Sequence, residues 1–392
     1  MSNHPAFVGM PMSARNRVTE VLETIDMVAQ IKNPAVAVSM TPSALRGLVR
    51  KDGKRKPHAQ MPAKHSTHFD LRYELGFPEM LELYRRAVDN QWDGDRDLPW
   101  DTDVDPLHPD TPLIAPEWQL YGGLEQFGIK LNQREAAELA YSQATWMLSN
   151  FMHGEQGALY ASAQVTESVR WLDGKLYGAT QVMDEARHLE VFHRYLDTKL
   201  NKIYKVNDNL FVIIDDLLTD SRWDIKFLGM QIMVEGLALG AFATLHNWTR
   251  EPLLRQLLKY VIQDEARHVH YGVLALRDHI TTQLSPAERR EREDWAFEVA
   301  VLMRNRFMAH EVYEEWFEGT ITRKQWNDFM LNVESMRYFR HTMFKRLVPN
   351  LEYIGLLSDR MRAHYEQAGM LEFVGGKNAT QLSGEEMVAE LE

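Results

Sequence analysis

The pentapeptide Asp-Glu-Ala-Arg-His occurs twice in this chain, beginning at Asp184 and again at Asp264. In a helix, residues i and i+3 lie on one face, so the glutamate and the histidine of each copy point the same way. A carboxylate and an imidazole on one face can bind a metal ion, and two such pairs on facing helices can hold two ions. The pairs are Glu185 with His188 and Glu265 with His268.

Two further glutamates stand thirty residues before the motif glutamates. They are Glu155 in "FMHGEQGALY" and Glu235 in "IMVEGLALGAF". The turn signals "LDG" at 172–174 and "NWTREP" at 247–252 fall near the middle of each interval. In an antiparallel helix hairpin, residues equidistant from the turn lie at the same height. Each hairpin therefore brings one glutamate level with one Glu-x-x-His pair, and we expect all six side chains to bind metal.

The alternative is that these charges lie on solvated helix faces. Glu155 and Glu235 stand among apolar and small residues, however, and buried carboxylates without partners are very costly. One further Glu-x-x-His pair, Glu190 with His193, lies about 140° around the helix from the first pair and has no counterpart in the second half. We expect this pair to be an ordinary surface pair.

Four carboxylates and two imidazoles, without a thiolate, suit iron or manganese. We expect two iron ions, with Mn/Fe as the alternative, because redox chemistry on dioxygen is the usual use of such a pair. A metal-bound histidine usually donates its second ring N–H to a carboxylate.

The aspartates and arginines of the repeated motif can supply that support. Each aspartate directly precedes a ligand glutamate and can reach across the bundle axis. We expect each one to orient the histidine of the opposite motif, with the arginines holding the aspartates. The alternative is that each arginine pairs only along its own helix. The residues are Asp184 for His268, Asp264 for His188, and Arg187 and Arg267 as their holders.

Helical patterns run almost without interruption from Asn132, where an N-cap is followed by Glu135 three residues later. The sequence predicts an all-α fold, with a ferritin-like four-helix bundle at its centre and additional helices around it. The expected divisions are an N-terminal arm, partly flexible, at 1–60, an extension with an aspartate- and proline-rich connection at 61–131, the bundle at 132–282, C-terminal helices packed on it at 283–372, and a flexible tail at 373–392.

The composition limits the classes of function. The 392 residues carry a net charge of −12, which argues against general binding to nucleic acid or to an anionic membrane. There is no cysteine, which excludes thiolate zinc sites and cysteine-ligated iron–sulfur clusters. We expect a cytoplasmic protein without a membrane span. A basic segment at 46–56 is expected to be a mobile, solvated arm or else a docking surface for an acidic partner.

The six ligand residues resemble those of the ferritin-like, carboxylate-bridged di-iron proteins, over residues 132–282. The resemblance implies a di-iron centre that activates dioxygen. Markers of known branches are absent: Phe192 stands at the radical tyrosine position of ribonucleotide reductase small subunits. Met230 and Ala158 stand where R2-like ligand-binding oxidases have a cross-linked tyrosine and valine. The chain therefore reads as a separate branch of di-iron oxygenases.

The expected reaction is hydroxylation, or a related oxidation, of a small hydrophobic, aromatic or acyl substrate. Electrons would come from a separate ferredoxin or reductase, because no flavin, nicotinamide or iron–sulfur motif is present. The alternatives are a ferroxidase or other iron-handling protein, an R2-like Mn/Fe or Fe/Fe oxidase, and a metal-cofactor subunit that acts on a partner protein. A homodimer is expected from the length of the chain outside the bundle. The predicted lining of the substrate pocket is Phe151, Ala158, Leu159, Phe192, Leu239 and Phe242.

Overall fold

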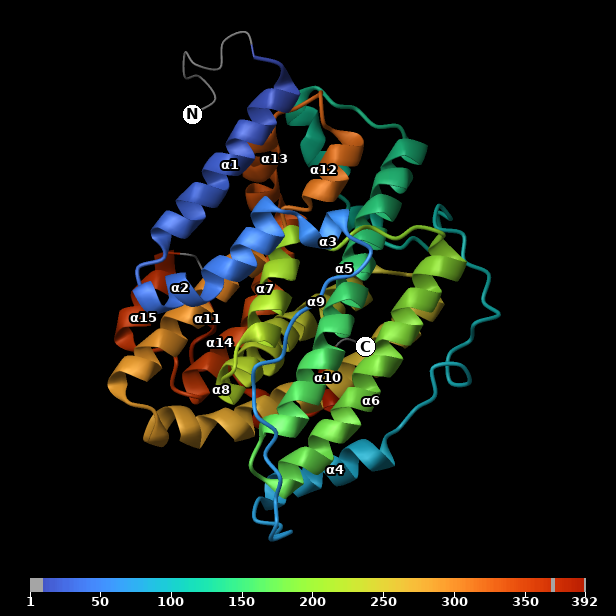
Figure 1. The fold of residues 1–392 in the computed structure, drawn as a ribbon. Coiled ribbons are helices and arrows are strands. Elements are labelled where there is room, and N and C mark those ends of the chain that lie inside the picture. Colours follow the sequence, from blue (N-terminus) through green and yellow to red (C-terminus); the bar gives the residue numbers. More distant parts are fainter. Residues whose placement is uncertain (1–9, 368–370, 391–392) are drawn as a thin grey trace.

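The computed structural model describes residues 10–367 and 371–390 (Figure 1). Within these ranges the only β pairing is an isolated bridge between Glu318 and Ile321, so the predicted all-α class is confirmed. The centre is a bundle of two helix hairpins, as the ferritin-like prediction requires. Its helices are α5 (Gln133–Ser168), α6 (Leu172–Tyr195), α8 (Trp223–Phe227) continued by the π-helical turns η6 (Leu228–Val234) and α9 (Glu235–Trp248), and α10 (Pro252–Asp278).

Local sequence explains where these helices begin. Asn132 and Glu135 form the predicted capping box at the start of α5, which satisfies two backbone N–H groups. At α10, the Glu251 carboxylate accepts from the first free backbone N–H groups, and Pro252 occupies the first helical position, where no N–H is needed. The π-helical turns of η6 end directly before Glu235, and such turns are frequent at functional sites.

The helices after the bundle cover one side of it. They are α11 (Pro286–Arg306), α12 (His310–Trp316), α13 (Arg323–Asn332), α14 (Glu334–Tyr353) and α15 (Asp359–Gln367). Helix α14 packs along α9, and Gly240 makes this approach close, since a Cβ there would lie 2.6 Å from the Met343 Cα atom. The chain leaves α11 through Ala309, which has a left-handed φ of 47°. This backbone conformation separates α11 from α12.

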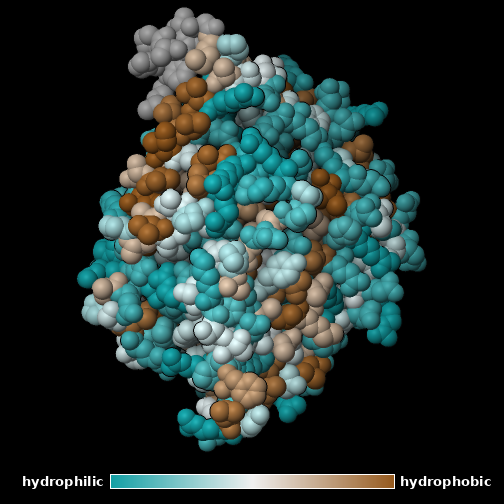
Figure 2. All heavy atoms as spheres, in the orientation of Figure 1, coloured by the Kyte–Doolittle hydropathy of each residue, from teal (hydrophilic) through white to brown (hydrophobic). Residues whose placement is uncertain are grey.

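The described N-terminal helices pack on other parts of the chain. The elements are α1 (Met12–Gln30), which contacts α13, and α2 (Pro34–Ala44), η2 (Leu45–Val49) and α3 (Asp52–Arg55), which contact α7 (Asp208–Thr219). The last of them, α4 (Pro78–Asp89), packs on α6 and α10 of the bundle. The face shown in Figure 2 is largely hydrophilic, but hydrophobic side chains gather over α1 and α2.

The expectation of a mobile basic arm at 46–56 is wrong. The Arg46 guanidinium lies 2.5 Å from a carboxylate oxygen of Asp215 on α7. Lys51 and Lys54 lie 2.7 and 3.2 Å from Asp208, and Lys54 also pairs with an acidic residue of α12. These three cations neutralise buried carboxylates of the same chain, so the segment is fixed to the fold, whereas Arg50, Arg55 and Lys56 are exposed.

The expectation of a flexible tail at 373–392 also fails for the residues described. Helix α16 (Gly384–Ala389) and the short turn η9 (Ala379–Gln381) pack against α10, and Met387 and Val388 are buried. A Cβ at Gly384 would lie 2.8 Å from the Gln263 Cα atom, so the tail touches the α10 backbone. Small and apolar residues at these positions give the tail a packed face.

One described helix, Trp223–Trp248, is long and apolar enough to cross a membrane by length and composition. Of its most apolar window, 94% is buried inside the protein. Its composition follows from its place at the core of the bundle, where every face meets another helix.

Candidate metal centre

The four glutamates and two histidines of the predicted ligand set meet inside the bundle. All six side chains are buried. They form two groups, each with ligand atoms within 4.8 Å of one another: Glu155, Glu185, His188 and Glu265, and Glu185, Glu235 and His268. The thirty-residue spacing in each hairpin has brought the side chains to one height.

The two motif glutamates lie between the two histidines. Glu185 Oε1 is 3.1 Å from His268 Nδ1, and Glu265 Oε1 is 3.2 Å from His188 Nδ1. Each glutamate is also 3.6 Å from the histidine of its own motif. The imidazole ring centroids are 6.0 Å apart. Glu185 and Glu265 are therefore near both histidines and would help to hold both ions.

Glu155 and Glu235 lie at opposite ends of the ligand cluster. Glu155 Oε2 lies 3.3 Å from His188 Nδ1, and Glu235 Oε2 lies 3.9 Å from His268 Nδ1. Each half thus has one histidine and one end glutamate, with Glu185 and Glu265 between the halves. This cluster is compatible with a di-metal site.

Buried polar atoms without a hydrogen-bond partner show whether these residues fit metal ions. Both carboxylate oxygens of Glu265, one oxygen each of Glu185 and Glu235, and Nδ1 of His268 are buried without a hydrogen-bond partner. Leaving such groups unpaired costs roughly 1–3 kcal/mol each, and more when they are charged. Divalent ions would satisfy all of these atoms with the ligand types that iron and manganese accept. The residues therefore fit the predicted cofactor.

Without metal, protons must neutralise the cluster. Burial raises the pKa of Glu155 well above its usual range, and the neighbouring carboxylate of Glu265 adds to the rise. Burial likewise raises the pKa of Glu235. Burial would lower the pKa of His188, but hydrogen bonds to Asp264 and Glu155 outweigh it and raise the pKa well above its usual value. Metal ions would replace these protons.

The aspartates make the crossed contacts expected from the sequence. His188 Nε2 lies 3.0 Å from Asp264 Oδ2, and His268 Nε2 lies 3.3 Å from Asp184 Oδ2. With the aspartates as acceptors, each histidine donates from Nε2 and turns Nδ1 toward the glutamates, so that Nδ1 would be the atom that binds metal.

The arginines connect the two aspartates. Arg187 donates to Asp184 on its own helix at 2.6 Å and to Asp264 across the bundle at 2.9 Å. Arg267 donates to Asp264 and lies 3.7 Å from Asp184. The two alternatives considered for the arginines thus occur together, and the four charges form one buried network.

Two residues that follow α4 complete this network and were missed from the sequence. Trp92 Nε1 donates to Asp264 at 2.8 Å, and the ring of Trp92 lies under the Arg187 guanidinium at 4.6 Å. Gln91 accepts from Arg187 at 2.7 Å and donates to Asp184 at 3.2 Å. No periodicity marks these positions, because they lie in an irregular connection that tertiary folding brings to α6 and α10.

A carboxamide supports the glutamates directly. Gln181 Nε2 donates to Glu185 at 3.1 Å and to Glu235 at 2.9 Å. Gln231, one turn before Glu235, approaches Gln181 at 3.5 Å. The sequence held a usable signal here, since Gln181 precedes Glu185 by four residues and so shares its helix face.

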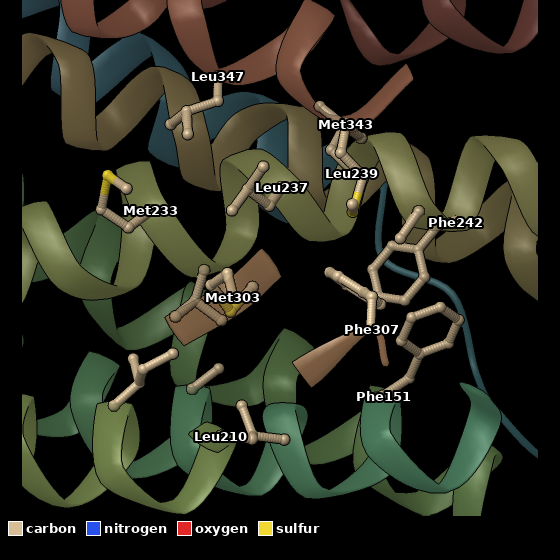
Figure 3. Packing of buried hydrophobic residues seen from close by; sticks show 14 of the residues in the cluster. Phe151, Leu210, Met233, Leu237, Leu239, Phe242, Met303, Phe307, Met343 and Leu347 are labelled. Carbon is tan, nitrogen blue, oxygen red and sulfur yellow. The ribbon is translucent and has the colours of Figure 1, made fainter. Parts of the chain in front are cut away.

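The residues expected to line a substrate pocket do not form one surface. Phe151, Phe192 and Phe242 pack together with ring centroids 4.6 to 6.0 Å apart, and Figure 3 shows Phe151 beside Phe242. Leu239 is buried one turn before Phe242 on α9. Phe151 precedes Glu155 by one turn, whereas Ala158 and Leu159 follow it by one turn.

The two sets therefore lie on opposite sides of the metal cluster along the bundle axis. Ala158 is buried and Leu159 is half-buried. One end of the cluster is aromatic, and Gln181 and Gln231 mark the other end. At the aromatic end, the three phenylalanine rings pack directly against one another.

The second Glu-x-x-His pair of α6 lies away from the cluster. Glu190 and His193 are both exposed, as expected from their angle on the helix. Spacing alone is therefore insufficient, and the burial of the face decides which pair can bind metal.

No protein-family model and no curated protein matches the chain. Among solved structures it is similar to a mutant R2-like ligand-binding oxidase with anaerobically reconstituted Mn/Fe cofactor, with 18% identity, a TM-score of 0.45, and coverage of 72% of this chain and 96% of that one. It is also similar to an R2-like ligand-binding oxidase with aerobically reconstituted metal cofactor after photoconversion, at 16% identity, a TM-score of 0.44, and coverage of 72% and 95%. With such identities, the function proposed below rests on the side chains of this chain.

Proposed function

We propose that this chain is a dioxygen-activating, non-haem di-iron oxygenase that oxidises a small hydrophobic substrate. The proposal rests on the buried cluster of four glutamates and two histidines, in which five ligand atoms lack a hydrogen-bond partner. A cluster of this charge is very costly to bury unless cations neutralise it. When bound, two iron ions supply redox chemistry on dioxygen.

The chain itself orients the ligands and excludes water. Asp264 and Asp184 hold the histidines so that Nδ1 faces the glutamates. Phe151, Phe192 and Phe242 make the environment on one side of the cluster apolar, which suits dioxygen and a hydrophobic or aromatic substrate. The electrons come from a separate reductase or ferredoxin in this proposal.

A second candidate function is ferroxidase. It is favoured by the packing of the three aromatic rings, which fills the space where an organic substrate would bind next to the cluster. Iron oxidation needs no organic pocket, whereas an oxygenase needs at least one of these rings to move aside.

Metal-free protein loaded anaerobically with Fe(II) would test the proposal. We expect two irons per chain, and loss of iron binding in a Glu185→Ala/His188→Ala variant. The matched control is Glu190→Ala/His193→Ala, which removes the same residue types from the exposed face of the same helix and should keep both irons. Equal loss in both variants would contradict the assigned site.

Oxygen uptake separates the two functions. With an electron donor and one iron pair per chain, an oxygenase consumes dioxygen at a rate that depends on a small apolar compound and yields an oxidised product. With excess Fe(II) and no organic compound, a ferroxidase accumulates oxidised iron well beyond two per chain. Accumulation of oxidised iron without substrate-dependent oxygen uptake would contradict the oxygenase and support the ferroxidase.

A further inference from the structure

Four buried polar side chains stand at steps of four residues along α6 and end at a metal ligand. They are Asp173, Tyr177, Gln181 and Glu185, and each is 0% exposed. Side chains at i and i+4 are neighbours on a helix, so the four form one continuous ridge. Helix α6 begins at Leu172, so this polar ridge runs from the start of the helix to the ligand cluster, over about 18 Å.

The outer part of the polar ridge holds atoms that no protein group satisfies. Among the described residues, Asp173 Oδ1 and Tyr177 Oη are buried without a hydrogen-bond partner. The other oxygen of Asp173 accepts from the backbone N–H groups of Gly76 and Phe77 at 3.0 and 3.1 Å. Native proteins leave few buried polar atoms unpaired, and ordered water is a common partner where the protein supplies none.

The facing helix α5 adds an unpaired group at the same height. Ser162 follows Glu155 by about two turns, and Tyr177 precedes Glu185 by about two turns. Hairpin symmetry therefore puts Ser162 and Tyr177 in one layer of the bundle. Ser162 Oγ is buried and has no hydrogen-bond partner in the part of the chain that the structure describes.

Gln231 of η6 joins the polar ridge to the ligands. Its Nε2 lies 3.5 Å from Gln181 Oε1, and Gln181 Nε2 donates to Glu235 at 2.9 Å. Its own Oε1 is buried and unpaired among the described residues. Gly272 gives this side chain its place, since a Cβ at that position would lie 2.5 Å from the Gln231 Cβ atom.

Tyr177 differs from the tyrosine that it touches. The rings of Tyr177 and Tyr271 have centroids 4.6 Å apart, but only the Tyr271 hydroxyl has a protein partner, the Gly174 carbonyl at 2.7 Å. Burial raises the pKa of Tyr177, whereas the charges of His268 and Arg267 oppose the rise. The Tyr177 hydroxyl is therefore close enough to the metal centre to feel its charges.

The spacing of the polar ridge suits water. A step of four residues advances about 6 Å along the helix axis, and two hydrogen bonds of about 2.8 Å each span nearly the same distance. One water can therefore join each polar group to the next, and a bridging water is nearly as favourable as a direct hydrogen bond. The outer end is near solvent, because residues 71–76 are exposed.

We propose that the polar ridge holds a chain of ordered waters that carries protons from the start of α6 to the metal centre. The residues that hold these waters are Asp173, Tyr177 and Gln181 of α6, with Ser162 and Gln231. Asp173 exchanges the proton with solvent at the outer end. The other four side chains stay neutral and orient the waters through their hydrogen bonds.

This inference rests on the proposed dioxygen chemistry, which needs protons at a buried site. Reduction of dioxygen to peroxide or water takes up one proton for each electron. Hydroxylation has the same balance: one oxygen atom enters the substrate, and the other leaves as water with the two electrons of the donor and two protons from solvent. All six metal ligands are buried, so these protons need a route through the protein.

A crystal structure of the Co(II)-loaded full chain, at a resolution that shows ordered waters, tests the chain of waters without any reaction. We expect one water within hydrogen-bond distance of Tyr177 Oη and another at Asp173 Oδ1. In Tyr177→Phe the first water should be lost while the other side chains of the ridge keep their positions. A wild-type structure with no water at Tyr177 Oη would overturn the proposal.

Single-turnover oxidation of the Fe(II)-loaded protein by dioxygen tests whether the waters carry protons. Tyr177→Phe should slow this step about 10-fold or more and raise its solvent deuterium isotope effect above the wild-type value. Ser162→Ala is a smaller change that should act in the same direction if the tyrosine variant misfolds. The matched control is Tyr271→Phe, which removes a hydroxyl outside the ridge and should keep the wild-type rate and isotope effect.

The isotope effect separates proton transfer from packing, because a purely structural role would lower Tm without changing it. Equal rates and equal isotope effects in Tyr177→Phe, Ser162→Ala and Tyr271→Phe would contradict the proposal. Oxidation of Fe(II) needs no organic substrate, so a slow Tyr177→Phe in a protein that oxidises no organic compound would support the ridge and contradict the oxygenase. A wild type that does not react with dioxygen at all would contradict both.

Discussion

Replacement of Asp264 by Asn tests how the histidines are held. Asp264 accepts from His188 Nε2 at 3.0 Å, Trp92 Nε1 at 2.8 Å and Arg187 Nη2 at 2.9 Å, and also from Arg267. Asparagine keeps the shape but removes the charge, and one of its terminal atoms becomes a donor that faces other donors. The histidine loses a fixed proton position and an anionic partner.

The expected magnitude follows from the contacts. Loss of such a supporting partner typically costs 10–100-fold in metal affinity, which is about 1.4–2.7 kcal/mol. Asp264 touches His188 and not His268, so the loss should fall on the group formed by Glu155, Glu185, His188 and Glu265. The other group should keep its affinity within a few-fold.

Anaerobic titration of the metal-free protein with Co(II), monitored by calorimetry, measures the affinity of both ligand groups for metal. In double-mutant cycles, Asp264→Asn should couple with His188→Ala and add independently with His268→Ala. Asp184→Asn should show the reverse pattern and is the matched control. Coupling of Asp264 with His268 instead, or unchanged affinity in Asp264→Asn, would refute the crossed arrangement.

Three further predictions concern stability, each measured as a shift in Tm. Gln181→Leu removes the carboxamide donor from two buried glutamates, so the metal-free protein should lose about 1–3 kcal/mol while Co(II)-loaded protein loses less; equal losses would contradict this. Gly240→Ala should cost about 1–3 kcal/mol because the new methyl group meets α14 backbone, whereas Gly154→Ala on α5, with open space around it, should be neutral or stabilising. Burial raises the pKa of Asp216 to about 6. The unfolded chain therefore loses this proton at lower pH than the native one, and native stability falls as pH rises from about 4 to about 6. Asp216→Asn should be more stable than the wild type by up to about 3 kcal/mol at pH 8, with the difference gone near pH 4; a difference independent of pH would contradict the assignment.

Several features of the fold and the site could be predicted because they depend on local geometry. The three-residue step from Glu185 to His188 is set by the helical repeat, and the capping box at Asn132 is set by its own side chains. The equal spacings from Glu155 and from Glu235 placed each pair at one height because a hairpin is symmetric about its turn. The convergence of six side chains therefore followed from helix geometry.

Other features were decided only when distant segments came together. Arg46 was expected to be solvated, but it reaches Asp215 across 169 residues of sequence. Trp92 reaches Asp264 from an irregular connection. Such partners have no common period, so nothing in the sequence pairs them.

The substrate side of the cluster shows the same limit. The sequence indicated that Phe151, Ala158 and Leu159 are near Glu155, and they are near it in the structure. The helical repeat also places Phe151 on one side of Glu155 and the other two residues on the opposite side. Only the packed bundle decides that Phe192 and Phe242, from other helices, join Phe151. The sequence by itself determined which side chains meet, because helical repeats and hairpin symmetry are local rules. The tertiary structure decided what surrounds them, because burial and charge pairing depend on neighbours that are remote in the chain.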